Sequence, residues 1–143
     1  MATNISTPPY VPVSWGELID KITILEIKSQ RMSGSARENV ARELALLEKA
    51  AGLVAGEQAI SALRAQLKTV NESLWQTEDR LREKDKAGEF DKEFVALARS
   101  VYADNDSRAA IKRRINLELR SEIMEEKSYG APNPELSRGQ SKS

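Results

Sequence analysis

A run of basic side chains follows two potential helix caps in the stretch DNDSRAAIKRR. Asn105 or Asp106 can cap the start of a helix, and free backbone N–H groups beside cations suit a phosphate or a carboxylate. Acidic residues come after the basic ones, which is the unfavourable order for a helix dipole. This order indicates either a bound anion or a solvated face with salt bridges between helices. The residues concerned are Arg108, Lys112, Arg113 and Arg114, followed by Glu118, Glu122, Glu125 and Glu126.

A single carboxylate falls inside an apolar stripe in the stretch SWGELIDKITILEIKSQR. At 100° per residue, Glu26 shares one helical face with Trp15, Ile19 and Ile22. A carboxylate in such a stripe is costly unless it is paired. Two interpretations follow from this position. Glu26 forms a buried ion pair or hydrogen bond, or it lines a polar pocket that it shares with other helices.

Polar side chains of two later helices are expected to meet Glu26. Asn71 and Glu78 border the apolar seam of a helix that is predicted to end at Gly88. Arg108 lies beside the apolar stripe of the last predicted helix. We therefore expect an anion-accommodating polar site between helices, in which basic side chains hold the anion and acidic ones orient them. The candidate ligand-binding residues are Glu26, Asn71, Glu78, Arg108, Lys112, Arg113, Asn116 and Glu126.

The composition narrows the chemistry by exclusion. The 143 residues include neither His nor Cys, which removes imidazole bases, thiolate nucleophiles, disulfides and thiolate zinc sites. Basic and acidic residues both number 22, so the net charge gives no reason to expect nucleic acid or an anionic membrane as a partner. No secretory signal or membrane span is recognisable. We expect a cytoplasmic protein without a cofactor that binds a small anion or another protein.

Two patterns keep a histidine-free enzyme as an alternative. Glu78, Asp79 and Glu83 have the helical spacing of carboxylates that hold magnesium in all-α nucleotide pyrophosphohydrolases, although the full paired pattern is missing. The stretch ELIDKITILEIKSQR resembles the first helix of small all-α chorismate mutases, which need neither metal nor histidine. An exposed, charged turn of helix accounts equally well for the first pattern. We therefore predict binding or assembly rather than catalysis.

About five helices are expected to position these residues. Residues 1–13 carry three of the five prolines and are expected to form an extended arm. The S-x-x-E spacing of a capping box occurs at Ser14 and again at Ser35. Helices are therefore predicted over about 14–32 and 35–51.

The rest of the chain continues the helical pattern. Apolar residues three and four apart predict a third helix that Gly88 ends. A fourth helix is expected over 90–101, and ADND separates it from a fifth that runs through Met124. Strand patterns are absent, so the prediction is an all-α bundle. The expected divisions are an arm at 1–13, one bundle domain at 14–129 and a disordered tail at 130–143.

Two of these helices present two apolar faces each. In the first, Ile24 and Ile27 form a second face among charged residues that include Asp20. In the last, Ala110 and Leu117 form a second face. A small bundle covers about one helix on all sides, so we predict a homo-oligomer, most simply a dimer. The alternative is that the N-terminal arm covers one of these faces.

Several motifs together resemble a family of small bacterial all-helical proteins catalogued only as a domain of unknown function. They are SWGELIDKITILEIK, NESLW, RSVYADNDSRAAIKRRIN and EEKSY. The resemblance implies no established activity. An occasional association of the family with glycosyltransferase functions implies a further alternative, an adaptor in bacterial sugar-polymer biosynthesis. Trp15 departs from the proline expected in many relatives. The resemblance adds these polar motif positions: Glu17, Asp20, Lys21, Lys28, Asn105, Asp106, Lys127 and Tyr129.

Overall fold

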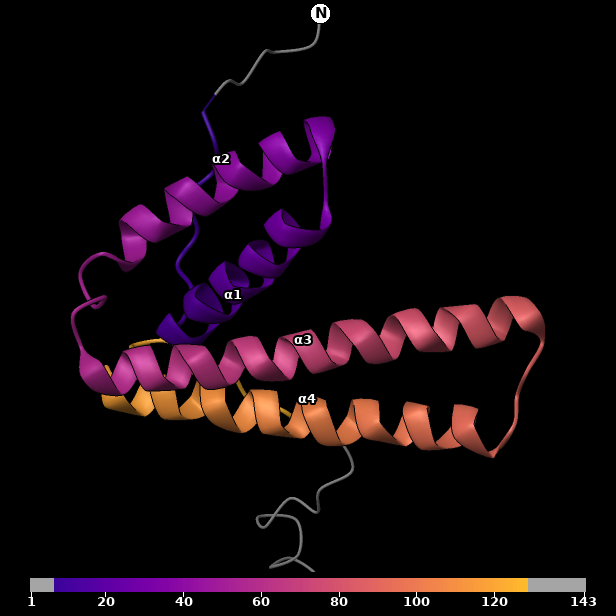
Figure 1. Ribbon diagram of the computed structural model, residues 1–143. Helices are drawn as coiled ribbons and strands as arrows, with labels where there is room; N and C mark the ends of the chain where they lie inside the picture. The colour runs from indigo at the N-terminus through magenta and orange to yellow at the C-terminus, as the bar shows by residue number, and fades with distance from the viewer. Residues whose placement is uncertain (1–6, 129–143) are drawn as a thin grey trace, which may run out of the picture.

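The computed structural model describes residues 7–128, and within that range the fold is all-helical, with four α-helices and no strand. Helices α3 and α4 form a long antiparallel hairpin, and α1 crosses one end of it (Figure 1). Helix α2 packs on α1, on the side away from the hairpin (Figure 1). The helices are α1 (Trp15–Arg31), α2 (Gly34–Ala51), α3 (Gln58–Ala87) and α4 (Lys92–Glu118).

Local signals place most helix ends where the sequence predicts them. The Ser14 hydroxyl accepts a hydrogen bond from the backbone N–H of Glu17 at 3.1 Å, as its capping position requires. Gly88 ends α3 in the left-handed conformation, with φ of 69°. The Asp91 carboxylate caps α4 by accepting from the N–H of Phe94 at 2.9 Å. Helix α2 begins at Gly34, one residue before the predicted start.

The predicted count of five helices is wrong, because α4 runs unbroken through ADND. Asn and Asp cost less than about 0.7 kcal/mol each inside a helix, and packing against α3 exceeds that cost. Asp104 accepts a hydrogen bond from the Ser73 hydroxyl of α3 at 2.8 Å. Asn105 and Asp106 are exposed within the helix and cap nothing. The free N–H groups invoked for an anion near Arg108 are therefore absent from this part of α4.

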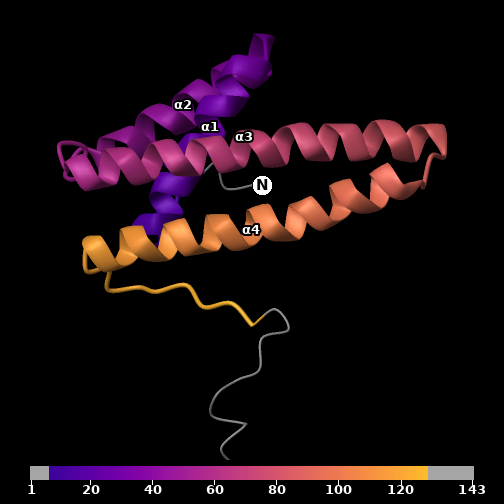
Figure 2. The same cartoon turned by 60° about the horizontal axis from the view of Figure 1, so that its bottom comes forward.

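Helix α4 also ends earlier than predicted, at Glu118. Arg120 adopts a left-handed φ of 49°, and the N–H of Ser121 bonds the carbonyl of Asn116 at 2.8 Å. The left-handed residue and this hydrogen bond form a Schellman-type helix end, with arginine at the position where glycine is usual. The segment that follows, residues 119–128, is not helical and turns back along α4 (Figure 2).

The core lies where α1 meets the other helices. Ile22 and Ile27, from the two predicted apolar faces of α1, are 0% and 1% exposed. Because α1 contacts all three other helices, the chain covers both faces itself. Residues 7–13 of the arm are exposed and cover neither face. The core cluster consists of Leu18, Ile19, Ile22, Ala51, Val54, Ile60, Leu63, Leu67 and Ile115.

The predicted disordered tail at 130–143, Tyr129 and residues 1–6 of the predicted arm lie outside the described residues.

Candidate functional site

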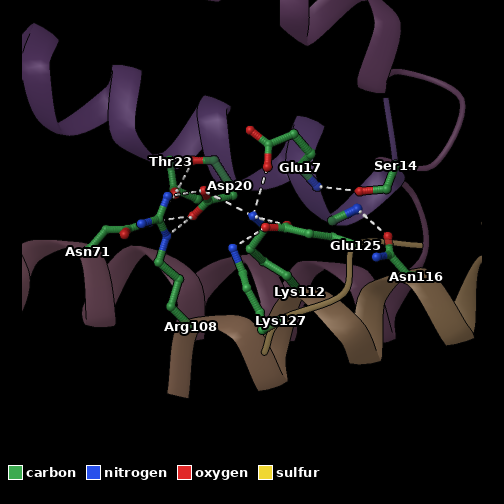
Figure 3. A network of polar contacts seen from close by, with 11 residues as sticks. Ser14, Glu17, Asp20, Thr23, Asn71, Arg108, Lys112, Asn116, Glu125 and Lys127 are labelled. Atoms are coloured by element: carbon green, nitrogen blue, oxygen red, sulfur yellow. Dashed lines mark hydrogen bonds and ion pairs between the residues drawn. The ribbon is translucent and has the colours of Figure 1, made fainter. Parts of the chain in front are cut away.

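Asp20 is a fully buried carboxylate at the crossing of α1, α3 and α4. The Arg108 guanidinium donates to both of its oxygens, with Nε 3.0 Å from Oδ1 and Nη2 bonded to Oδ2. Asn71 donates from Nδ2 to the same Oδ1 at 2.9 Å and to the Thr23 hydroxyl at 2.9 Å. Figure 3 shows these side chains converging from three helices. The bidentate ion pair with Arg108 compensates the buried negative charge of Asp20.

Lys112 forms a second, adjoining group of ion pairs on α4. Its ammonium lies 2.7 Å from Glu17 Oε2, 2.7 Å from Glu125 Oε2 and 4.0 Å from Asp20 Oδ2 (Figure 3). The Lys112 side chain is 8% exposed. Its two closest carboxylate partners belong to different kinds of element. Glu17 belongs to α1, and Glu125 belongs to the non-helical segment after α4.

These contacts keep the basic groups of the cluster charged. Burial opposes the charged form of Lys112, but hydrogen bonds to Glu125 and Glu17 outweigh it and raise the lysine pKa. The hydrogen bond to Asp20 is the main reason that the pKa of Arg108 is raised. Lys112 and Lys127 lower the pKa of Glu125 to about 2. Arg108, Lys112 and Glu125 therefore all carry their charges at neutral pH.

A glycine sets the distance between α1 and α4 at this crossing. A Cβ on Gly16 would lie 2.5 Å from the backbone oxygen of Lys112. The N–H of Gly16 instead donates to Asn116 Oδ1 at 2.6 Å. Gly16 and Asp20 are four residues apart and share a helical face. The absent side chain lets Asp20 come within reach of Lys112 and Arg108.

A pocket of about 470 Å³ opens beside the network, between α1, α4 and the segment after α4. This volume lies within the range of small-molecule sites, roughly 300–1,000 Å³. Three acidic and three basic side chains line it, so their charges cancel. Tyr102, which is 73% exposed, stands at the same pocket. The lining residues are Glu17, Tyr102, Asn105, Asp106, Arg108, Ala109, Lys112, Glu125 and Lys127.

The structure brings only part of the predicted site together. Asn71, Arg108, Lys112 and Asn116 gather around the α1–α4 crossing. From the family-motif positions it adds Glu17, Asp20, Asn105, Asp106 and Lys127 at the pocket or in the network that borders it.

Glu26 does not belong to this site, and the expectation that it shares one with Arg108 is wrong. It pairs with Arg64 and, at 3.1 Å, with Lys68, both on α3. Arg64 also bonds Glu48 of α2. Burial raises the pKa of Glu26, but Arg64 and Lys68 outweigh that effect and leave the pKa lowered. The ion-pair interpretation of this carboxylate is the one the geometry supports.

The remaining predicted positions lie elsewhere. Glu78 is exposed on α3. Arg113 and Glu126 form an exposed pair at 3.5 Å that is not in the pocket. Lys21 lies 3.8 Å from Glu43 of α2. Lys28 is half-buried in the last turn of α1.

Sequence reasoning missed the role of Asp20, which the wheel placed on the charged side of α1. Gly16 was the available signal, because a glycine inside a helix often marks the close approach of another backbone. Glu125 was missed as a site residue since its contact with Lys112 depends on the early end of α4. No sequence signal for that end is present, because Arg120 occupies the left-handed position.

Residues 7–128 contain neither a cluster of metal ligands nor a helix that could span a membrane. No group of three or more acidic side chains there could hold a metal ion, and Glu78, Asp79 and Glu83 are all exposed. None of the helices in the same range is both long and apolar enough to cross a membrane.

The chain belongs to a family of unknown function (DUF6165), which it matches over residues 10–141. This range contains the whole Asp20–Lys112 network and the pocket beside it. No curated protein and no solved structure matches the chain. The match confirms the resemblance to a family without an established activity, so the function has to be argued from the site.

Proposed function

We propose that this member of the family is a binding protein for a small anionic ligand, held in the pocket between α1, α4 and residues 119–128. The observation that carries the proposal is the pairing of a ligand-sized pocket with two largely buried cations, Arg108 and Lys112, in its wall. Both side chains stay charged at neutral pH. Charged hydrogen-bond donors in the wall of a pocket favour a carboxylate or a phosphate.

The energetic cost of the network supports a role beyond folding. Taking the charges of Asp20, Arg108 and Lys112 out of water costs several kcal/mol per ion, and apolar residues of similar size often stabilise a protein as well or better. The adjacent core, built from Ile and Leu side chains, provides the apolar alternative within the same molecule. We therefore attribute the retention of these charges to ligand binding.

Donor groups remain available for a ligand after the internal bonds are counted. Arginine has five N–H donors, and the bonds from Arg108 to Asp20 involve only its Nε and Nη2. The Nη1 group of Arg108 is thus free to donate to a ligand anion. Asn105 supplies an amide at the same pocket, and Tyr102 supplies an exposed ring against which a flat part of a ligand can pack.

A thermal-shift screen with paired variants tests the proposal. Ala109 lines the pocket, and Ala103 is an exposed position of α4 that lines neither the pocket nor the groove between α3 and α4, so Ala109→Phe fills the site while Ala103→Phe is the control. We expect a phosphorylated or carboxylated compound to stabilise the wild type and the control but not Ala109→Phe. A ligand at 100 times its Kd adds about 2.7 kcal/mol. Equal shifts in all three proteins, or no shift with any anion, would contradict the proposal.

A homodimer is the second candidate function, and one observation favours it. Leu117, on the second apolar face of α4, is 59% exposed. A shallow groove of about 640 Å³ lies between α3 and α4 beside Ala110, also on this face, and is lined partly by Val70 and Ile111. Light scattering over a range of concentrations tests self-association, which Leu117→Lys should weaken. A wild-type monomer at every concentration would remove this candidate.

A further inference from the structure

We infer that residues 119–128 form a strap whose Glu125 carboxylate occupies the anion subsite of the pocket, and that a ligand binds by displacing it. The inference rests on the proposed function and specifies how that site is regulated. Glu125 then acts as an internal competitor, and the ligand class follows from what it replaces, a carboxylate held by the Lys112 ammonium of α4.

The geometry at Glu125 is that of a bound anion. One carboxylate oxygen lies 2.7 Å from the ammonium of Lys112, and the other pairs with the ammonium of Lys127. Glu125 lines the pocket together with Arg108. The lowering of the Glu125 pKa to about 2 by its two lysine partners agrees with a tightly held carboxylate. A carboxylate or phosphate of a ligand presents oxygens of the same kind to Lys112, which stays on α4 when the strap moves with Lys127.

The two carboxylates on Lys112 differ in how they are anchored. Glu17 is in the first turn of α1, where the Ser14 cap and the bond from Gly16 to Asn116 fix the backbone. Glu125 is on a segment without regular structure. The backbone of Glu17 is therefore held in place by α1, whereas the backbone of Glu125 can move with the strap. Lys112 thus has one partner on a fixed helix and one on a segment that can move away from it.

The contacts of the strap divide it into a fixed base and a releasable end. At the base, the Ser121 N–H bonds the Asn116 carbonyl, and the Ser121 hydroxyl accepts from the N–H of Trp15 at 3.3 Å. Beyond Ser121, two ion pairs join the strap to α4, Glu125 with Lys112 and the exposed pair of Glu126 with Arg113. Ser121 is thus the position about which the strap opens.

Displacement predicts a specific effect on affinity. A site that is open in only a fraction of molecules binds with its intrinsic affinity reduced by that fraction. If Glu125 closes the subsite in about nine molecules of ten, its removal should tighten anion binding about tenfold. Glu126 offers a matched control because it is the next residue on the strap, carries the same charge and pairs outside the pocket.

The test is a calorimetric titration of the full chain with inorganic phosphate at pH 7 and constant ionic strength. We expect Glu125→Gln to bind phosphate about tenfold more tightly than the wild type and Glu126→Gln to stay within about twofold of it. Equal or weaker binding by Glu125→Gln, with phosphate still bound by the wild type, would overturn the strap and leave the proposed function intact. Absence of binding in all three proteins would overturn the proposed function and the inference with it.

Hydrogen exchange supplies a readout that does not depend on any ligand. Without phosphate, the amides of residues 122–128 should exchange faster in Glu125→Gln than in the wild type or Glu126→Gln, because the ion pair that holds the strap is gone. In the wild type, phosphate should accelerate the same amides. Identical exchange in the three free proteins would contradict a strap held by Glu125.

Discussion

Asp20 and Glu26 are carboxylates on the same helix, and each pairs with an arginine from another helix, yet their surroundings differ. The Asp20 side chain is 1% exposed and sits among Arg108, Asn71 and Thr23 beside a pocket. The Glu26 side chain is 22% exposed, and its ion pairs do not line that pocket. We refer to Asp20, Thr23, Asn71, Arg108 and Lys112 as the Asp20 cluster, and to Glu26, Glu48, Arg64 and Lys68 as the Glu26 cluster.

The two clusters differ in what lies beside them. The Glu26 cluster joins helices, whereas the Asp20 cluster also borders a pocket. The Glu26 cluster links α1, α2 and α3 at a half-exposed junction, where water screens the charges. The Asp20 cluster is largely removed from water, and its Lys112 holds a carboxylate from a non-helical segment. Burial, a partner on a non-helical segment and an adjacent pocket therefore distinguish the Asp20 cluster as the functional candidate, and the presence of an arginine–carboxylate pair alone does not.

The largest expected effect contrasts the two clusters directly. Asp20→Ala should lower the free energy of unfolding by about 3–5 kcal/mol, because it removes a buried carboxylate that bonds both Arg108 and Asn71. Glu26→Ala should cost no more than about 1 kcal/mol, since Arg64 keeps Glu48 and the Glu26 carboxylate is partly exposed. Denaturant unfolding of both variants measures the difference. Similar losses in the two variants would mean that the clusters are energetically equivalent.

The close helix crossing gives the next largest effect. Gly16→Ala places a Cβ 2.5 Å from the Lys112 carbonyl oxygen and should destabilise the protein by about 1–3 kcal/mol through overpacking. Gly56 is the control, because a Cβ there meets nothing within 4 Å. Gly56→Ala should be neutral or stabilising by up to about 1 kcal/mol. Equal unfolding midpoints for the two variants would argue against a glycine-dependent crossing.

The pH dependence of stability should report the contact between the strap and the Asp20 cluster. The pKa of Glu125 falls from 4.5 to about 2 on folding, so its contribution is present above pH 4.5 and is lost as the pH drops toward 2. The wild type should exceed Glu125→Gln in unfolding free energy by on the order of 1 kcal/mol at pH 6. That gap should close by pH 2. A constant gap across this range would contradict the ion pair.

Salt should produce the smallest effect and should act mainly on the Glu26 cluster. The cost of Glu26→Gln, below about 1 kcal/mol at low salt, should shrink further in 1 M NaCl, where the Debye length is about 3 Å. The cost of Asp20→Ala should change little, because that carboxylate is buried. Unfolding of each variant against the wild type at two salt concentrations provides the comparison.

Most of the fold could be predicted from the sequence because helix periodicity and end signals are local. The Ser14 cap and Gly88 act through their own neighbours, and both are confirmed. The break at ADND was wrong because the weak propensities of Asn and Asp are overridden by packing along α3. The end of α4 could not be predicted, since Arg120 gives no signal of a left-handed residue.

The candidate site was only partly predictable for a related reason. A helical wheel identifies which residues share a face, but it does not show what covers that face. It therefore favoured Glu26, in the larger apolar stripe, over Asp20, which α4 and α3 bury. Arg108, Lys112 and Asn71 were predicted from their charge and position, and they do meet. Their acidic partner was misassigned, and the strap that carries Glu125 lay outside any periodic pattern.

An NMR titration of the uniformly labelled chain with inorganic phosphate, and separately with succinate, shows whether the pocket binds an anion. It detects binding even at millimolar affinity and locates it by residue. If the pocket is an anion site, amides of residues 102–112 and 121–127 should show saturable shifts, with those around Glu26 and Arg64 unmoved. Shifts that are absent with both anions, or that appear equally at the Glu26 cluster, would contradict an anion site at the Asp20 cluster.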